Sequence, residues 1–269
     1  MSDARSGSEG HSVVHSWRVQ RRVIGALLKR EILTRYGRHN IGFLWLFVEP
    51  MIFTLGVTAL WTATKSVHGS NLPIVAFALT GYSSVLLWRN MPGRCINAIL
   101  PNLSLMYHRN VRVIDIYFAR LLLEGGGATI SFVTLSIFFI SIGWLKPPED
   151  VMEIFAGWIL IAWFGSALAI FLGALSEQSE MVEKLWHPAS YLIFPLSGAA
   201  FMVDALPKAA QEIVLYIPMV HGVEIVREGY FGNEARAHYD LTYILPFCLI
   251  LTLAALSQVA IMSRKVTPE

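Results

Sequence analysis

Residues 17–50 read WRVQRRVIGALLKREILTRYGRHNIGFLWLFVEP, and this stretch decides how the chain folds. Its first part, residues 17–38, holds seven basic residues and one acid, Glu31. Its second part begins an apolar run over residues 41–64, in which Glu49 is the one ionisable residue. A helix needs about 20 apolar residues to cross a bilayer, and Lys and Arg gather on the cytosolic side of a span. The stretch therefore predicts a membrane protein with its N-terminus in the cytosol.

The rest of the chain repeats this apolar pattern. Hydrophobic residues make up 55% of the chain and charged residues 15%, whereas soluble proteins average roughly 25% charged residues. Six runs reach or approach the length of a span, and they cover residues 41–64, 72–88, 118–143, 154–175, 186–203 and 241–262. The fifth run is short and contains Pro188 and Pro195. The predicted fold class is an all-α polytopic membrane protein with one six-span transmembrane domain over residues 39–264.

The distribution of Lys and Arg predicts that both termini are cytosolic. With six spans and the N-terminus inside, 16 of the 21 Lys and Arg residues fall in cytosolic segments, as the positive-inside rule requires. Residues 1–16 are polar and lack the apolar run of a secretory signal. We expect them to form a disordered cytosolic tail. Cys95 and Cys248 do not have the spacing of a metal site, and a disulfide between them is not expected.

Residues 17–38 have the pattern of an amphipathic helix that lies in the membrane interface. One side is apolar and the opposite side basic; the apolar residues are Trp17, Ile24, Leu27 and Leu28, and the basic ones Arg18, Arg22 and Lys29. Such a helix places its cations near anionic head groups. The alternative is a basic anchor that fixes orientation and has no further role.

Two features of the spans predict how their side chains pair and pack. Arg120 and Glu124 are four residues apart at the start of the third span, so they can pair with each other. Gly165, Ala169 and Gly173 form a stripe of small residues on the fourth span, which allows a neighbouring helix to approach closely.

Two segments outside the spans are more polar, or more interrupted by turn residues, than the spans themselves. Residues 90–117 are too polar to cross, and they fit either a short cytosolic helix that docks on a soluble partner or a solvated loop. Residues 197–239 contain bend and turn signals followed by a moderately apolar stretch. A full crossing there would reverse the last span, so we expect a re-entrant pair of short helices on the outer side, between spans five and six.

The sequence offers no enzymatic motif. It has no phosphate-binding loop, no His-Glu-x-x-His and no Gly-x-Ser-x-Gly. His221, Glu224 and Glu228 share a helical face, but Arg227 lies among them, so an ion-pair cluster is favoured over a metal site. Neither a metal nor a cofactor is predicted for this chain. Glu49, a carboxylate inside a span, is either a structural lock or part of a conduit.

Cations and aromatic rings gather at the predicted inner boundaries of the spans. They are Arg35, Arg38, Arg89 and Arg94, with Trp45, Trp186 and Tyr191. One interpretation is snorkelling cations and an aromatic belt. The other is an electropositive, aromatic-lined entrance that binds an acidic or lipid-linked sugar, because guanidinium groups bind carboxylates and phosphates in bidentate fashion.

Two motifs resemble those of a known family. Arg35-Tyr36-Gly37-Arg38, followed by Gly42, Trp45, Glu49 and Pro50, is similar to the entrance of type-2 ABC exporter permeases for polysaccharides. The segment from Pro218 to Glu224, with Arg227, Glu228 and Phe231, resembles the capsule-export branch. The Asn-Pro pair that related O-antigen and teichoic-acid permeases usually have near Ile217 and Pro218 is absent. The resemblance covers the chain after residue 17.

The resemblance implies partners and roles for several residues. It implies a homodimer that works with two copies of a separate ATPase subunit, which binds ATP and Mg. The ATPase would dock on coupling helices near residues 97–107 and 176–184, which contain Asn97, Leu103, Tyr107, Glu177, Glu180 and Glu183. The bend after residue 196 would supply an outer gate with Ser197, Gly198, His221, Glu224 and Arg227.

The resulting functional prediction is a permease subunit of an ABC exporter in the bacterial inner membrane. Its expected substrate is a lipid-linked, acidic capsular polysaccharide, and the route would continue through a periplasmic co-polymerase-like protein and an outer-membrane channel. No nucleic acid is expected as a partner. Two alternatives stay open: a permease for O-antigen, teichoic acid or a small molecule, and a membrane-embedded glycosyl- or acyltransferase. The second needs a group of His, Asp or Glu at the membrane face, which the sequence does not show.

Overall fold

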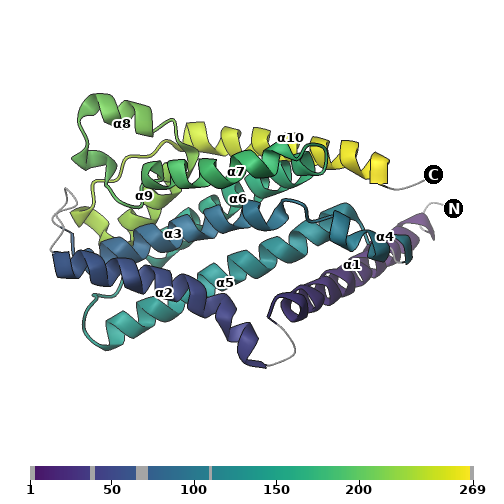
Figure 1. Ribbon diagram of the computed structural model, residues 1–269, viewed down its shortest axis with the longest axis horizontal. Helices are drawn as coiled ribbons and strands as arrows, with labels where there is room; N and C mark the ends of the chain where they lie inside the picture. The colour runs from purple at the N-terminus through teal and green to yellow at the C-terminus, as the bar shows by residue number, and fades with distance from the viewer. Residues whose placement is uncertain (1–3, 37–39, 65–71, 109–110, 267–269) are drawn as a thin grey trace.

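The computed structural model describes residues 4–36, 40–64, 72–108 and 111–266, and the elements of this part are all helical. The helices form an elongated bundle along one long axis (Figure 1). The N- and C-termini lie at the same end of the bundle as the short helix α4 (Leu103–His108), and α8 (Lys208–Val214) lies at the opposite end. The two ends are called the terminal end and the α8 end below.

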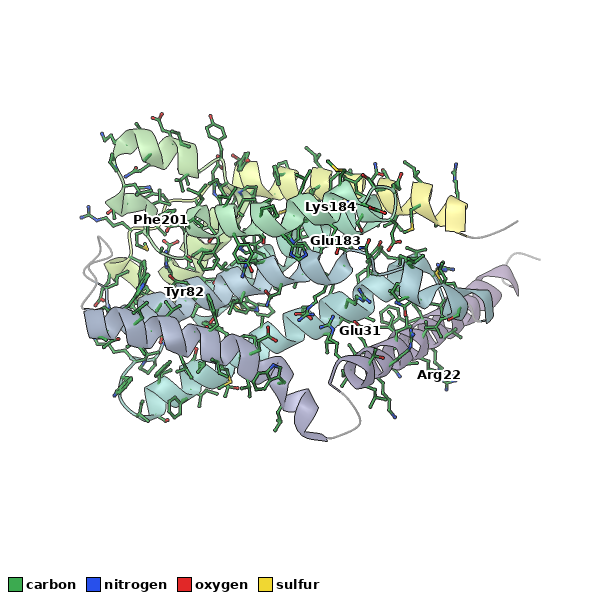
Figure 2. All side chains as sticks on the ribbon, viewed as in Figure 1. Arg22, Glu31, Tyr82, Glu183, Lys184 and Phe201 are labelled. Atoms are coloured by element: carbon green, nitrogen blue, oxygen red, sulfur yellow. The ribbon has the colours of Figure 1, made fainter. Side chains whose placement is uncertain are left out.

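Helix α1 (Ala4–Tyr36) is longer than the predicted interfacial helix. It includes most of residues 1–16, which we expected to be disordered. This part of the chain contains no proline that would end a helix, since the first proline is Pro50. A helix held by packing extends at little cost, because each added residue gains a hydrogen bond. Val23 and Leu27, from the apolar side of α1, pack against the bundle. Arg22 points away from it (Figure 2). Trp17, which the pattern placed on the same apolar side as Leu27, is exposed.

Helix α3 (Ile74–Cys95) forms the centre of the bundle. Its residues from Ala76 to Trp88 are all buried, between α2 (Asn40–Thr64), α5 (Val113–Ser141), α6 (Val151–Ser176) and α9 (Pro218–Phe231). The predicted small-residue stripe on α6 faces this helix: a Cβ added to Gly165 would lie 2.8 Å from the Cα of Trp88. The predicted close approach of helices is therefore confirmed.

Three helices of the described residues are long and apolar enough to span a membrane. They are α5, α6 and α10 (Leu241–Val266), and α8 and α9 qualify together as a pair bent by 109°. Within α2, the part that the structure describes fully contains a further apolar segment, Val48–Ala63. Six spans therefore remain a prediction. The two short helices expected in the outer segment are present as α8 and α9.

The fifth predicted span, residues 186–203, is not a single helix. Helix α7 runs from Met181 to Ile193 and is followed by a 3-10 turn, η2 (Phe194–Leu196), that contains Pro195. Gly198 then adopts φ +82°, which only glycine adopts readily. The chain therefore turns at this point and reaches a second 3-10 turn, η3 (Val203–Ala205), before α8.

The segment that follows α3 is shorter than predicted, because α3 continues to Cys95 instead of ending near residue 88. A 3-10 turn, η1 (Leu100–Asn102), and α4 supply the predicted short helix. Near the other end, η4 (Gly232–Glu234) follows α9, and Asp240 precedes α10. The side chain and the backbone N–H of Thr242 both donate to the Asp240 carboxylate, which lowers its pKa.

Candidate functional site

A polar pocket with a volume of about 340 Å³ lies between α2, α3 and α7. We call it the Arg89 pocket. It brings together Arg89, Arg94, Trp186 and Tyr191, which the sequence predicted as an entrance, and adds Glu49, whose role was open. The full lining is Glu49, Arg89, Asn90, Gly93, Arg94, Trp186, His187, Ser190 and Tyr191.

Arg89 is held in this pocket by aromatic rings. Its Cζ atom lies 4.7 Å from the ring centroid of Tyr191 and 5.5 Å from that of Phe194, within the range of cation–π contacts. Its Nε–H is buried and has no hydrogen-bond partner. Among the described residues Arg89 makes no ion pair or hydrogen bond, so its donors are available to a ligand.

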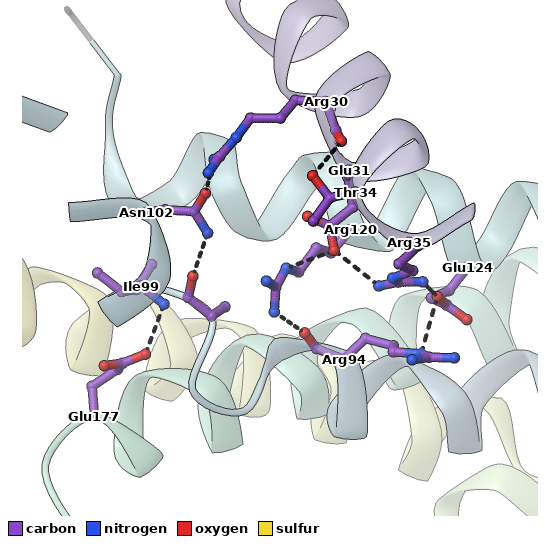
Figure 3. Close-up of polar contacts among 11 residues, drawn as sticks. Arg30, Glu31, Thr34, Arg35, Arg94, Ile99, Asn102, Arg120, Glu124 and Glu177 are labelled. Carbon is purple, nitrogen blue, oxygen red and sulfur yellow. Dashed lines mark hydrogen bonds and ion pairs between the residues drawn. The ribbon is translucent and has the colours of Figure 1, made fainter. Parts of the chain in front are cut away.

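A second cluster of charges joins the pocket to α1 (Figure 3). Glu124 of α5 binds Arg35 of α1 and also lies 3.4 Å from Nε of Arg94. Glu31 of α1 lies 3.1 Å from Nη2 of Arg35 and 3.3 Å from Nε of Arg120. Arg120 therefore pairs with Glu31 and not with Glu124, contrary to the predicted pair. The reason is that the docked α1 places a carboxylate beside Arg120.

The remaining predicted entrance residues lie outside the pocket. Arg35 is mostly buried between the carboxylates of Glu31 and Glu124. Its contacts are therefore structural, and it does not line the pocket. Trp45 is exposed on α2, and Arg38 lies outside the described residues.

The two predicted coupling segments contact each other at the terminal end. The backbone N–H of Asn97 donates to Oγ of Ser176 at 3.1 Å, and its side-chain amide donates to Glu183 at 2.6 Å. The N–H of Ile99 donates to Glu177 at 2.8 Å. Asn97 has φ +51°, a left-handed conformation that Asn tolerates better than most residues. The sequence assigned these acids to partner docking, but two of the three join the segments.

The third acid and the other predicted coupling residues are placed differently. Glu180 is exposed and pairs with Lys184 at 3.3 Å. Leu103 packs against the core. Tyr107 belongs to α4, and its side chain lies outside the described residues.

Arg227 organises the predicted outer gate at the α8 end. Its guanidinium is fully buried and donates to three backbone carbonyls, those of Gly198 at 2.6 Å, Ala199 at 2.8 Å and Phe201 at 2.5 Å. Its Cζ lies 3.9 Å from the ring centroid of Phe77. The turn after α7 is therefore fastened to α9 and α3; we call it the outer turn.

Glu224 and His221 extend these contacts. Glu224 lies 3.9 Å from Arg227 and accepts hydrogen bonds from the N–H groups of Val203 and His238. His221 accepts from the N–H of Asp240 through Nδ1, so Nε2 donates to a carbonyl of the chain before α9. These bonds confirm the predicted ion-pair and hydrogen-bond cluster for His221, Glu224 and Arg227, and Glu228 takes no part in them. Ser197 is also buried there, and its hydroxyl donates to the carbonyl of Phe194.

Comparison with known proteins identifies the family. Residues 22–231 match the ABC-2 type transporter family. The chain belongs to this family. It is 45% identical to the capsule polysaccharide export inner-membrane protein CtrC of Neisseria meningitidis, over 93% of this chain and 95% of that one. It is 43% identical to the capsule polysaccharide export inner-membrane protein BexB of Haemophilus influenzae, with the same coverage. The polysialic acid transport protein KpsM of Escherichia coli is 26% identical over 92% of each chain.

Sequence reasoning missed several residues of this ABC-2 type transporter subunit. Asn90, His187 and Ser190 line the Arg89 pocket, and a helical spacing of three to four residues from Trp186 and Tyr191 would have indicated the last two. Gly81 makes room for Arg227: a Cβ there would lie 2.6 Å from Nη2 of Arg227. No local pattern marks Gly81, since the two residues meet only in the folded chain.

Proposed function

We propose that this protein is the permease subunit of an ATP-driven exporter that moves capsular polysaccharide across the bacterial inner membrane. The observation that carries the proposal is the similarity, over nearly the full length of both chains, to proteins named for capsule polysaccharide export. As a permease it performs no covalent chemistry, and hydrolysis takes place on a separate ATPase that holds ATP and Mg.

The proposed assembly is a homodimer with six spans in each chain, α1 in the membrane interface and α8–α9 as re-entrant helices. Both termini are cytosolic, and two ATPase copies bind the coupling segments. In support, the termini and the coupling segments lie together at the terminal end (Figure 1). A periplasmic co-polymerase-like protein and an outer-membrane channel complete the route.

Residues of the chain have separate parts in this proposal. Arg89 and Arg94, with Trp186 and Tyr191, bind the acidic end of a lipid-linked chain, because cations and rings meet in one pocket there. The segments joined by Asn97 receive the movement of the ATPase. The outer turn held by Arg227 is the gate at the far end.

Deletion of the gene, followed by complementation, tests this function. We expect the deletion strain to lose surface capsule and to accumulate the polysaccharide inside the cell, and the tagged protein to co-purify with an ATPase. Accumulation of O-antigen or teichoic acid would show that the transported substrate is that polymer and not capsular polysaccharide. Normal capsule in the deletion strain, or a purified chain that acts without an ATPase as a transferase, would refute the proposal.

A further inference from the structure

We propose that the Arg89 pocket binds an oxyanion attached to a sugar ring, either a uronic acid carboxylate or a sugar phosphate. Arg89 holds the anion, and Glu49 selects for ligands that also carry hydroxyl groups. This inference rests on the proposed function, because it defines which part of a transported saccharide the site recognises.

The first support is the difference between Arg89 and the other arginines near it. Arg35, Arg94 and Arg120 each have a carboxylate within ion-pair distance. Arg89 has none among the described residues, and its Nε–H is buried without a partner. A buried donor without a partner costs free energy that an anionic ligand would recover. Because rings hold the guanidinium, its N–H fork is oriented before a ligand binds.

The second support is the acid that α2 contributes to the lining. Glu49 of α2 lines the pocket but forms no ion pair or hydrogen bond with the described residues. A carboxylate only accepts hydrogen bonds, so it repels a bare anion and favours a ligand with hydroxyl donors. A sugar acid offers an anion and several separate hydroxyl groups, whereas inorganic phosphate offers only the P–OH donors of the anion itself.

The neutral lining agrees with a saccharide. Asn90 and Ser190 supply small polar groups, and Trp186 and Tyr191 supply aromatic surface. The volume of about 340 Å³ lies at the lower end of the range for small-molecule sites, about 300–1,000 Å³. The pocket therefore suits a terminal sugar rather than a long stretch of chain.

Binding of soluble probes to the full-length protein in lipid nanodiscs tests the inference. The probes are glucuronate, glucose 1-phosphate, glucose and inorganic phosphate, followed by saturation-transfer NMR. We expect glucuronate or glucose 1-phosphate to bind at least about tenfold more tightly than glucose, since a charge-assisted hydrogen bond has about this value. We also expect it to bind more tightly than inorganic phosphate, which lacks the sugar hydroxyls that donate to Glu49. Which of the two binds distinguishes a carboxylate from a phosphate ligand.

Four variants assign the residues. Arg89→Ala should weaken binding of the sugar acid about tenfold or more. Arg89→Lys keeps the charge but not the N–H fork of the guanidinium, so its affinity should lie between those of the unchanged protein and Arg89→Ala. Arg22→Ala is the matched control, because Arg22 is an arginine that points away from the bundle and does not line the pocket. Glu49→Gln should bring the affinity for inorganic phosphate closer to that for the sugar acid.

Equal affinity of Arg89→Ala and the unchanged protein would overturn the inference, and so would the absence of binding by both sugar acids. An intermediate affinity of Arg89→Lys for the sugar acid shows that the chain still folds when Arg89 is replaced. Capsule assays separate the two proposals. If the deletion strain loses its capsule but Arg89→Ala exports normally, only the site is refuted; if the deletion strain keeps its capsule, the proposed function is refuted.

Discussion

Replacing Gly81 with alanine tests whether Arg227 fastens the outer turn. An added Cβ would lie 2.5 Å from the carbonyl oxygen of Ala199 and 2.6 Å from Nη2 of Arg227, closer than real contacts allow. Helix α3 is buried on all sides at this position and cannot move away. The guanidinium or the turn has to shift, and the hydrogen bond between them is lost.

The cost follows from these contacts. A hydrogen bond with a charged donor contributes about 1.5–3 kcal/mol, and overpacking of a filled core costs about 1–3 kcal/mol. Alanine recovers about 1 kcal/mol, because it is the better helix former. The net cost is about 1.5–5 kcal/mol, which raises the population with an open outer turn roughly 10- to 4,000-fold.

Labelling of an added cysteine measures this population. Ala200→Cys lies between two of the carbonyls that Arg227 binds, and both native cysteines are buried. We expect Gly81→Ala to speed labelling of this cysteine by a maleimide in nanodiscs. Gly126→Ala, where an added Cβ meets no atom within 4 Å, is the matched control. Equal labelling rates in the two variants would refute the role of Arg227 as a fastening for the turn.

Three further changes have expected outcomes in thermal unfolding or proteolysis. Asn97→Ala loses the 2.6 Å side-chain hydrogen bond to Glu183 and places alanine at φ +51°, so it should cost about 1–3 kcal/mol. The exposed Glu180→Gln should cost less than about 1 kcal/mol, and equal costs would contradict a junction between the coupling segments. Glu124→Gln should release α1 and speed its cleavage by trypsin, and unchanged cleavage would contradict the described docking. Gly157→Ala, whose Cβ would lie 2.8 Å from a backbone nitrogen of α9, should unfold at a lower temperature than Gly126→Ala; equal temperatures would contradict the close contact.

Helices with strong apolar runs were predictable from the sequence. The ranges 118–143, 154–175 and 241–262 differ by only a few residues from α5, α6 and α10. Hydropathy determines these helices because each is apolar along its length. The chain after residue 186 was predicted less well, since Pro195 and the left-handed Gly198 end α7 inside an apolar run. Hydropathy does not register backbone conformation.

The candidate site was predictable in composition but not in the roles of its arginines. Position at a helix end marked Arg35 and Arg89 alike. The two differ because Arg35 meets Glu124, which lies 89 residues later in the chain, whereas Arg89 meets only rings. Long-range pairing of this kind depends on how α1 docks on α5, and no local pattern encodes it.

The joined coupling segments relate the terminal end to the Arg89 pocket. Asn97 follows the end of α3, and Glu183 lies in the first turn of α7, so the bond between them ties together the two helices that supply most of the pocket lining. A force on either segment therefore acts on both walls of the pocket.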